Sequence, residues 1–369
     1  MDLNFNNNSD RGTKRFLKFL IAILAVTGVF LGGYIWDREV GLQQASLLDN
    51  TLLNRFQENG EATISESLRF IKLTSEDSRF AVLSEDGSNL IYYVPASGEI
   101  KSVPVNGSGS SAGVAIIEKS AENITWSKNR KELILVRNGR SKYFDLSSGM
   151  IKELPANTMY PALSQFGDKL SYVSFNNNEG SGHINISDPR IEGFKQIMPT
   201  RSSYWISSWI GESLLSLYKP DSRYFELSSI YTLDIQKEKL VSIITLEKNL
   251  SFRWSPTGNK ILYSSDDPII GKLKLYVNNL SSGDKTEINL DTSASKCAWK
   301  HDETAVYCSK SEPGGDAFYE IGLLEEKGPI KIMTPDDNVE ATDLILTSSG
   351  EYLVFRNLNN NRLYSVLLK

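Results

Sequence analysis

A short hairpin pattern recurs seven times along the chain. Each copy has an aromatic or leucine anchor, a polar residue, a tight turn and an apolar run, most clearly in RWSPTGNKILYS at 253–264. The anchors are Leu83, Trp126, Leu163, Trp209, Trp254, Trp299 and Leu346. They are spaced 37 to 47 residues apart and include four of the six tryptophans in the chain. Such regular spacing indicates a repeat architecture rather than isolated hairpins.

Each hairpin is followed by further short strands. A third apolar run follows the hairpin, as at 228–236 and 272–280, and most copies add a short fourth run, as at 194–199 and 329–334. Four strands in a period of about 40–45 residues are typical of one propeller blade. The sequence therefore predicts an all-β fold, a seven-bladed β-propeller over residues 66–369.

The last copy lacks a fourth strand, because only NRLYSVLLK follows its hairpin. An unassigned run at 68–75, LRFIKLTS, resembles the fourth strands of the other copies. Closing a propeller removes the sheet edges that would otherwise be exposed. We therefore expect strand 68–75 to complete the last blade by pairing with residues 362–368.

The hairpin motif resembles a known repeat. RWSPTGNKILYS is similar to the TolB-type, WD-repeat-like propeller repeat, whose pattern is close to W-S-P-D-G-K-x-I-x-F/Y. The resemblance extends over residues 66–369, although three copies replace Trp with Leu and only one has the complete Ser255-Pro256. It implies a propeller fold. Proteins of this type include periplasmic envelope components that bind partner proteins and the propeller domains of prolyl-oligopeptidase-type peptidases.

The N-terminal region contains a long apolar stretch. Residues 19–36 are 18 consecutive residues without a charge, and Phe16 and Leu17 extend the stretch beyond Lys18. This length predicts a transmembrane helix at 16–36. A cleaved signal peptide is the alternative, but its apolar region would be shorter and end in a small-residue cleavage site. Basic residues precede the stretch, which predicts a cytoplasmic tail at 1–15 and an extracytoplasmic propeller, periplasmic or on the cell surface.

Residues 37–65 are predicted to form a stalk helix and a linker. A loose apolar stripe runs along 37–58. This stripe would pack on the following domain or pair with the stalk of a second copy, so self-association through 37–58 is an additional expectation.

The sequence contains few groups that could do chemistry. The net charge of −5 excludes the basic surface that nucleic-acid binding requires. No H-E-x-x-H, phosphate-loop or dinucleotide motif is present, and the two histidines, His183 and His301, fall in or beside loops. We therefore expect a non-enzymatic protein without a cofactor or resident metal. The alternatives are a metal-dependent enzyme of the lactonase or cyclase type, and a propeller that binds glycan or peptidoglycan.

The two cysteines flank the sixth hairpin symmetrically. Cys297 and Cys308 would face each other on a regular two-stranded ladder. A cross-strand disulfide is one interpretation, since the domain is predicted to lie in an oxidising compartment. Two small apolar residues in a strand pair are the other.

Long loops in the third to sixth repeats define the predicted partner surface. They follow the second strand of each repeat, at 174–183, 218–226, 264–272 and 309–318, whereas the turns inside the hairpins are short. Long loops on a rigid scaffold commonly carry function, and exposed apolar side chains suit protein contacts. We expect an envelope protein or peptide to bind there. The candidate residues are Asn177, Glu179, Arg223, Tyr224, Phe225, Asp266, Asp267, Ile269, Ile270 and Phe318.

Overall fold

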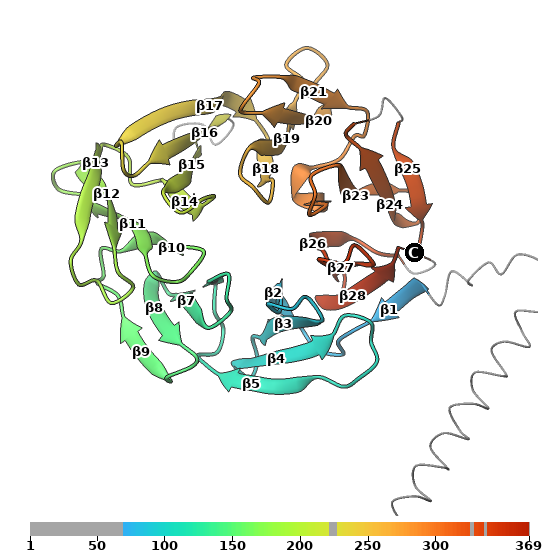
Figure 1. Ribbon diagram of the computed structural model, residues 1–369, viewed down its shortest axis with the longest axis horizontal. Coiled ribbons are helices and arrows are strands. Elements are labelled where there is room, and N and C mark those ends of the chain that lie inside the picture. The colour runs from blue at the N-terminus through green and yellow to red at the C-terminus, as the bar shows by residue number, and fades with distance from the viewer. Residues whose placement is uncertain (1–68, 221–226, 325–327, 336–337, 369) are drawn as a thin grey trace, which may run out of the picture. The chain divides into compact units, whose positions relative to one another are not determined.

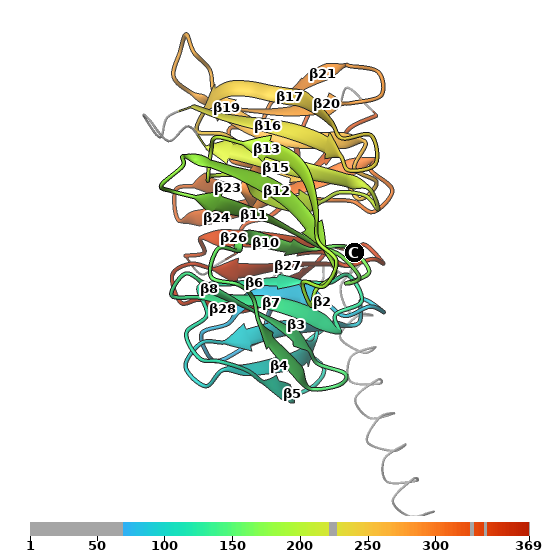
Figure 2. The ribbon, with the colours of Figure 1, turned by 90° about the vertical axis from the view of Figure 1, so that its left-hand side faces the viewer.

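The computed structural model describes residues 69–220, 227–324, 328–335 and 338–368. They form seven four-stranded antiparallel sheets arranged in a ring, viewed down the axis in Figure 1 and from the side in Figure 2. The predicted all-β, seven-bladed propeller is therefore confirmed.

The first four blades follow the chain order, each from its inner strand outward. Blade 1 contains β2 (Arg79–Leu83), β3 (Asn89–Val94), β4 (Glu99–Pro104) and β5 (Ala112–Ile116). Blade 2 contains β6 (Asn123–Trp126), β7 (Glu132–Arg137), β8 (Arg140–Asp145) and β9 (Met150–Glu153). Blade 3 contains β10 (Met159–Leu163), β11 (Leu170–Asn176), β12 (Ser181–Ser187) and β13 (Lys195–Thr200). Blade 4 contains β14 (Ile206–Trp209), β15 (Leu214–Pro220), β16 (Leu227–Asp234) and β17 (Lys239–Lys248).

The remaining blades follow the same plan until the last. Blade 5 contains β18 (Ser251–Trp254), β19 (Lys260–Asp266), β20 (Leu273–Asn279) and β21 (Lys285–Ile288). Blade 6 contains β22 (Cys297–Trp299), β23 (Ala305–Glu312), β24 (Gly315–Gly322) and β25 (Ile330–Met333), and is preceded by the short 3-10 helix η1 (Ala294–Lys296). Blade 7 contains β26 (Ala341–Leu346), β27 (Tyr352–Asn357), β28 (Arg362–Leu367) and β1 (Phe70–Lys72).

The ring is closed by β1, which pairs antiparallel with β28 as predicted. Phe70 lies opposite Val366 and Lys72 lies opposite Tyr364 in this ladder. The Phe70 ring also stacks on Tyr364, with 5.2 Å between ring centroids. The N-terminal end of the propeller thus supplies the outer strand that the C-terminal repeat lacks.

The four repeat tryptophans connect neighbouring blades. Each indole N–H donates a hydrogen bond to the preceding blade. The acceptors are Phe80 O for Trp126 (2.9 Å), Ala162 O for Trp209 (3.0 Å), Ser216 Oγ for Trp254 (2.8 Å) and Arg253 O for Trp299 (3.1 Å). The anchor position of the repeat is therefore an inter-blade contact as well as a packing position.

The hairpin turns make a second set of contacts between blades. Gly258 has φ +74°, and a Cβ at this position would approach Ile210 O to 2.7 Å. The corresponding turn of blade 6 has Glu303, whose carboxylate accepts hydrogen bonds from Thr257 N (2.8 Å) and Thr257 Oγ1 (2.6 Å) in blade 5. At the position where blade 5 has a glycine, blade 6 has Glu303, and the carboxylate of Glu303 binds the hairpin turn of blade 5.

The predicted membrane span at 16–36 and the stalk at 37–65 lie outside the described residues. Within the described part of the chain, no helix has the length and apolar character needed to cross a bilayer.

Phe70→Ala tests the closure of the ring. We expect the free energy of unfolding to fall by about 2 kcal/mol, because a partly buried ring that packs on blade 7 is removed. Urea denaturation measures the change. Lys72→Ala, on an exposed side chain of the same strand, should change stability by less than about 0.5 kcal/mol. Equal effects of the two substitutions would contradict the pairing.

Candidate interaction face and axial channel

The two ends of the ring differ in their connections. Because the strands of a blade alternate in direction, the first strand begins where the second strand ends, and the connections between blades lie at that end. We call this end the loop face; it includes residues 176–181, 200–206, 266–273 and 312–315. The opposite end, the turn face, includes the hairpin turns 84–88, 164–169 and 255–259. In Figure 2 the strands run across the view between these two ends.

Four predicted residues lie at one loop of blade 5. Ile269 is 91% exposed and Ile270 is 57% exposed in the β19–β20 connection. The Asp267 carboxylate accepts hydrogen bonds from the backbone N–H groups of Ile269 (2.8 Å) and Ile270 (3.0 Å), and the Ile270 bond contributes most to lowering the pKa of Asp267. Asp266 accepts a hydrogen bond from Asn249 Nδ2 at 2.6 Å. The two aspartates therefore shape a loop that presents two isoleucines to solvent.

Of the other predicted residues, two are exposed on the loop face and three lie outside the described part of the chain. Asn177 and Glu179 are exposed in the β11–β12 connection of blade 3. Arg223, Tyr224 and Phe225 lie outside the described residues.

The prediction for Phe318 is wrong. Its side chain is fully buried, with its ring 5.0 Å from that of Phe355 in blade 7. The reason is that β23 continues to Glu312 and β24 begins at Gly315, so the connection is a tight turn rather than a long loop. Phe318 is therefore a strand residue of the core between blades 6 and 7.

A cavity of about 380 Å³ lies between blades 3 and 4 on the loop face. Its lining residues are Phe175, Arg201, Ser202, Ser203, Tyr204, Lys219, Leu227, Ser229, Tyr231 and Leu246. Tyr204 is 46% exposed and Leu246 is 65% exposed. The Lys219 ammonium lies 5.3 Å from the ring centroid of the neighbouring Trp205.

The repeat pattern of the sequence does not predict this cavity. Its residues do not share one position of the repeat, and Trp205 lies four residues before the anchor Trp209. The Trp205 indole N–H donates to Thr200 Oγ1 at 2.8 Å, so this tryptophan is fixed within the connection between the blades. The sequence feature that could have indicated the cavity is the aromatic pair Tyr204-Trp205, which lies outside the repeated positions.

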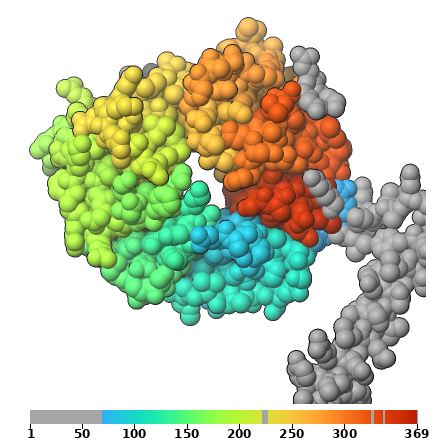
Figure 3. All heavy atoms as spheres, in the orientation of Figure 1, coloured from blue at the N-terminus to red at the C-terminus, as the bar shows by residue number. Residues whose placement is uncertain are grey.

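The ring is hollowed at its centre, as Figure 3 shows. A cavity of about 500 Å³ lies where the inner strands begin, and its lining includes residues from blades 1, 2, 5 and 7. The lining residues are Arg79, Phe80, Ala81, Glu122, Asn123, Arg253, Asp343, Leu344, Ile345 and Arg356. We call this cavity the channel mouth. Three arginines and two acidic residues are therefore among the residues that line this cavity.

The histidines do not join the channel mouth. His183 lies on β12 opposite Ser174, and His301 is exposed in the β22–β23 turn. Among the residues that the structure describes, no group of three or more His, Cys, Asp and Glu side chains is arranged to hold a metal ion.

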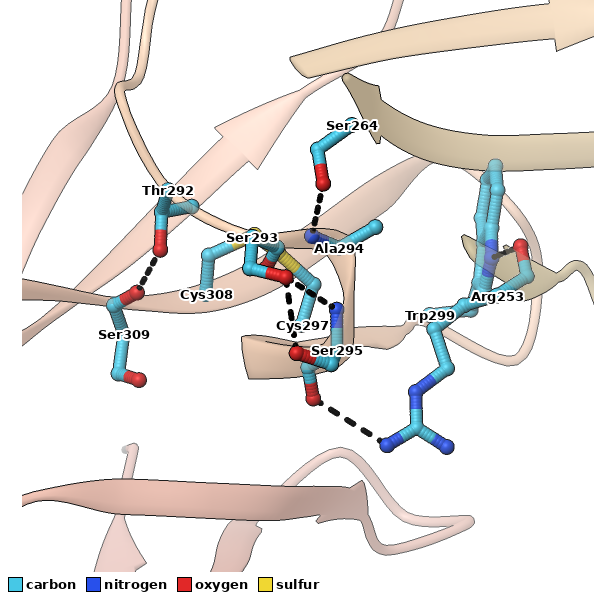
Figure 4. Close-up of a disulfide and its surroundings, with 10 residues drawn as sticks. All are labelled: Arg253, Ser264, Thr292, Ser293, Ala294, Ser295, Cys297, Trp299, Cys308 and Ser309. Atoms are coloured by element: carbon cyan, nitrogen blue, oxygen red, sulfur yellow. Dashed lines mark hydrogen bonds between the residues drawn. A yellow bond between two sulfur atoms is a disulfide. The ribbon is translucent and has the colours of Figure 1, made fainter. Parts of the chain in front are cut away.

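Cys297 and Cys308 lie directly opposite each other on β22 and β23 and form a disulfide, shown in Figure 4. Both side chains are fully buried. The bridge follows η1, whose Ala294 N–H donates to Ser264 Oγ of blade 5 at 3.0 Å. Of the two interpretations of the cysteines, the structure therefore has the disulfide, at the junction of blades 5 and 6.

Comparisons with known proteins show the fold. No protein-family model matches the chain, and no curated protein matches it in sequence. An oligogalacturonate lyase solved in complex with manganese is similar over 82% of this chain and 90% of its own, with 12% identity and a TM-score of 0.60. The Cps50 (Swd1) β-propeller domain of Myceliophteria thermophila is similar over 81% of this chain and 100% of its own, with 12% identity and a TM-score of 0.58.

TolB from Acinetobacter baumannii matches 76% of this chain and 63% of its own, with 12% identity and a TM-score of 0.44. The two matches with TM-scores of 0.60 and 0.58 show the fold alone.

Cys297→Ala with Cys308→Ala tests the disulfide. We expect the double variant to lose about 3 kcal/mol of unfolding free energy, because a bridge across an 11-residue separation restricts the unfolded chain. Urea denaturation measures the loss. Alkylation of the unreduced, unfolded wild-type protein should find no thiol, and two alkylated cysteines would refute the bridge.

Proposed function

We propose that this protein is a non-enzymatic interaction scaffold of the cell envelope, held at the membrane by residues 16–36. Its propeller would lie outside the cytoplasm, in the periplasm or on the cell surface. The observation that carries the proposal is the presentation of exposed apolar side chains on the loop face.

The apolar side chains come from two neighbouring blades and the connections around them. Tyr204 and Leu246 line the cavity between blades 3 and 4, and Ile269 and Ile270 project from blade 5. Exposed apolar groups with polar neighbours are characteristic of protein-binding surfaces, and buried aromatic anchors contribute much of their affinity. We therefore expect a protein or peptide of the envelope to dock over blades 3 to 5.

Two features support the extracytoplasmic location. The uncharged stretch at 19–36 is long enough to span a bilayer, and basic residues precede it. The disulfide between Cys297 and Cys308 is of a kind that persists in oxidising compartments and is rare in the cytosol. Self-association through the stalk at 37–58 stays a prediction.

Glycan binding is a second candidate. The cavity between blades 3 and 4 combines the aromatic side chains of Phe175, Tyr204 and Tyr231 with Arg201 and serine hydroxyls. Aromatic faces beside polar groups suit sugar rings. Binding of soluble peptidoglycan fragments that is lost in Tyr204→Ala, without capture of any protein, would favour this candidate over the scaffold.

Ile269→Asp combined with Ile270→Asp tests the scaffold. The full-length variant should capture at least tenfold less of any specific partner from detergent-solubilised membranes of the cells that produce it, because two charges replace the apolar contact. Quantitative mass spectrometry of the captured proteins measures this.

Phe166→Asp is the matched control. Phe166 is 61% exposed but lies in a hairpin turn on the opposite, turn face. This substitution should leave capture unchanged. Equal capture by all three proteins, or a loss confined to Phe166→Asp, would place the partner elsewhere and overturn the proposed surface.

A further inference from the structure

The three arginines of the channel mouth differ in how their charges are balanced. Arg79 Nε and Nη2 donate to the two carboxylate oxygens of Asp77, at 3.1 and 3.0 Å. Arg356 Nε and Nη2 both lie 2.9 Å from Asp343 Oδ2. Each of these guanidinium groups therefore has its own carboxylate.

Arg253 has no such partner. Its guanidinium donates to a neutral acceptor, Ser295 O, at 3.2 Å, and its Nε is buried without a hydrogen-bond acceptor. No ion pair within the described part of the chain joins Arg253 to a carboxylate, although the charge of Asp343 acts on it at longer range. The residue is half-buried, and a buried Nε–H without an acceptor is costly unless another group compensates it.

The position of Arg253 is set by the inter-blade contacts. Its backbone O accepts the Trp299 indole N–H, while its side chain extends away toward Ser295 of η1, as Figure 4 shows. The backbone and the side chain of this one residue thus make separate contacts with blade 6 and the helix before it. The charge is held at the channel mouth by a strand and a helix rather than by a flexible loop.

The remaining acidic group of the channel mouth is already engaged. Glu122 Oε1 accepts the backbone N–H of Asn138 at 2.8 Å. Asp343 Oδ2 is already bound by Nε and Nη2 of Arg356. With Asp77 counted as the partner of Arg79, three arginines and three carboxylates surround the cavity, and Arg253 is the arginine that has no carboxylate of its own.

We propose that the channel mouth binds a carboxylate group and that Arg253 is its charge partner. A planar guanidinium forms strong, directional hydrogen bonds with a carboxylate, and a cavity of about 500 Å³ accommodates either a small organic acid or an acidic side chain of a bound protein. This carboxylate site goes beyond the proposed scaffold function. It rests on that function only if the carboxylate belongs to a protein partner.

Calorimetric titration of the full-length protein in mild detergent tests the site with two probes. Succinate supplies a free carboxylate, and N-acetyl-Ala-Glu-Ala-amide supplies one carried by a peptide. We expect at least one probe to bind saturably and more weakly as salt is raised. Stronger binding of succinate would indicate a small organic acid, and stronger binding of the peptide would indicate a protein partner.

Arg253→Gln should weaken the binding at least tenfold, because a charge-assisted hydrogen bond is lost. Arg253→Lys keeps the charge but not the planar donor set, and should give an intermediate affinity with the fold retained. Arg140→Gln removes the same charge from an exposed strand residue outside the channel mouth and should bind like the wild type. Circular dichroism verifies that the three variants are folded.

Failure of both probes to bind the wild type would overturn the proposal, as would equal affinities for the wild type and both Arg253 variants. These titrations contain no partner protein. Their failure therefore leaves the loss of capture by the loop-face variant as an independent test of the scaffold.

Discussion

The pairing of β1 with β28 is the contact on which the rest of the ring depends. Without it, blade 7 would have three strands, and the N-terminal end of the propeller would not be joined to its C-terminal blade. Further bonds fix the junction: Leu73 N donates to Leu363 O at 2.9 Å, and Leu363 N donates to Thr74 Oγ1 at 3.0 Å. Ser365 Oγ also donates to Val105 O of blade 1, at 2.8 Å. Both ends of the described chain are thereby held in one blade.

Inside the closed ring, neighbouring blades are connected at defined points as well as through apolar packing. The repeat tryptophans donate to the preceding blade, and Glu303 holds the turn of the blade before it. These contacts are directional, so they fix the rotation between the blades that they join. The positions of the loop face and the channel mouth follow from that arrangement.

The sequence predicted the ring because its information is local and repeated. Each anchor and each short turn predicts the hairpin of a single blade, and the run at 68–75 predicts the missing fourth strand of the last blade. Phe318 was wrongly predicted to lie at a long loop. The Pro-Gly-Gly segment before it is compatible with a long loop or with a two-residue turn, so the sequence does not show where the flanking strands end.

The channel mouth could not be predicted for a different reason. Counted from the repeat anchors, Arg79 lies four residues before Leu83, whereas Arg253 lies directly before Trp254. Residues at unlike positions of separate repeats meet only when the ring has closed. The loop residues Ile269 and Ile270 were identifiable because their exposure follows from an apolar pair next to aspartates in a turn. Lys219, which lines the cavity between blades 3 and 4, lies over the ring of Trp205, and this tryptophan is outside the repeat pattern.

The central functional claim is that a partner docks on the end of the ring where the inner strands begin. Site-specific photo-crosslinking in intact cells tests it most directly, with the photoreactive residue placed at position 270 on the loop face or at position 166 on the turn face. We expect a defined protein adduct from position 270 and none from position 166. An adduct from position 166 alone, or from neither position, would contradict it.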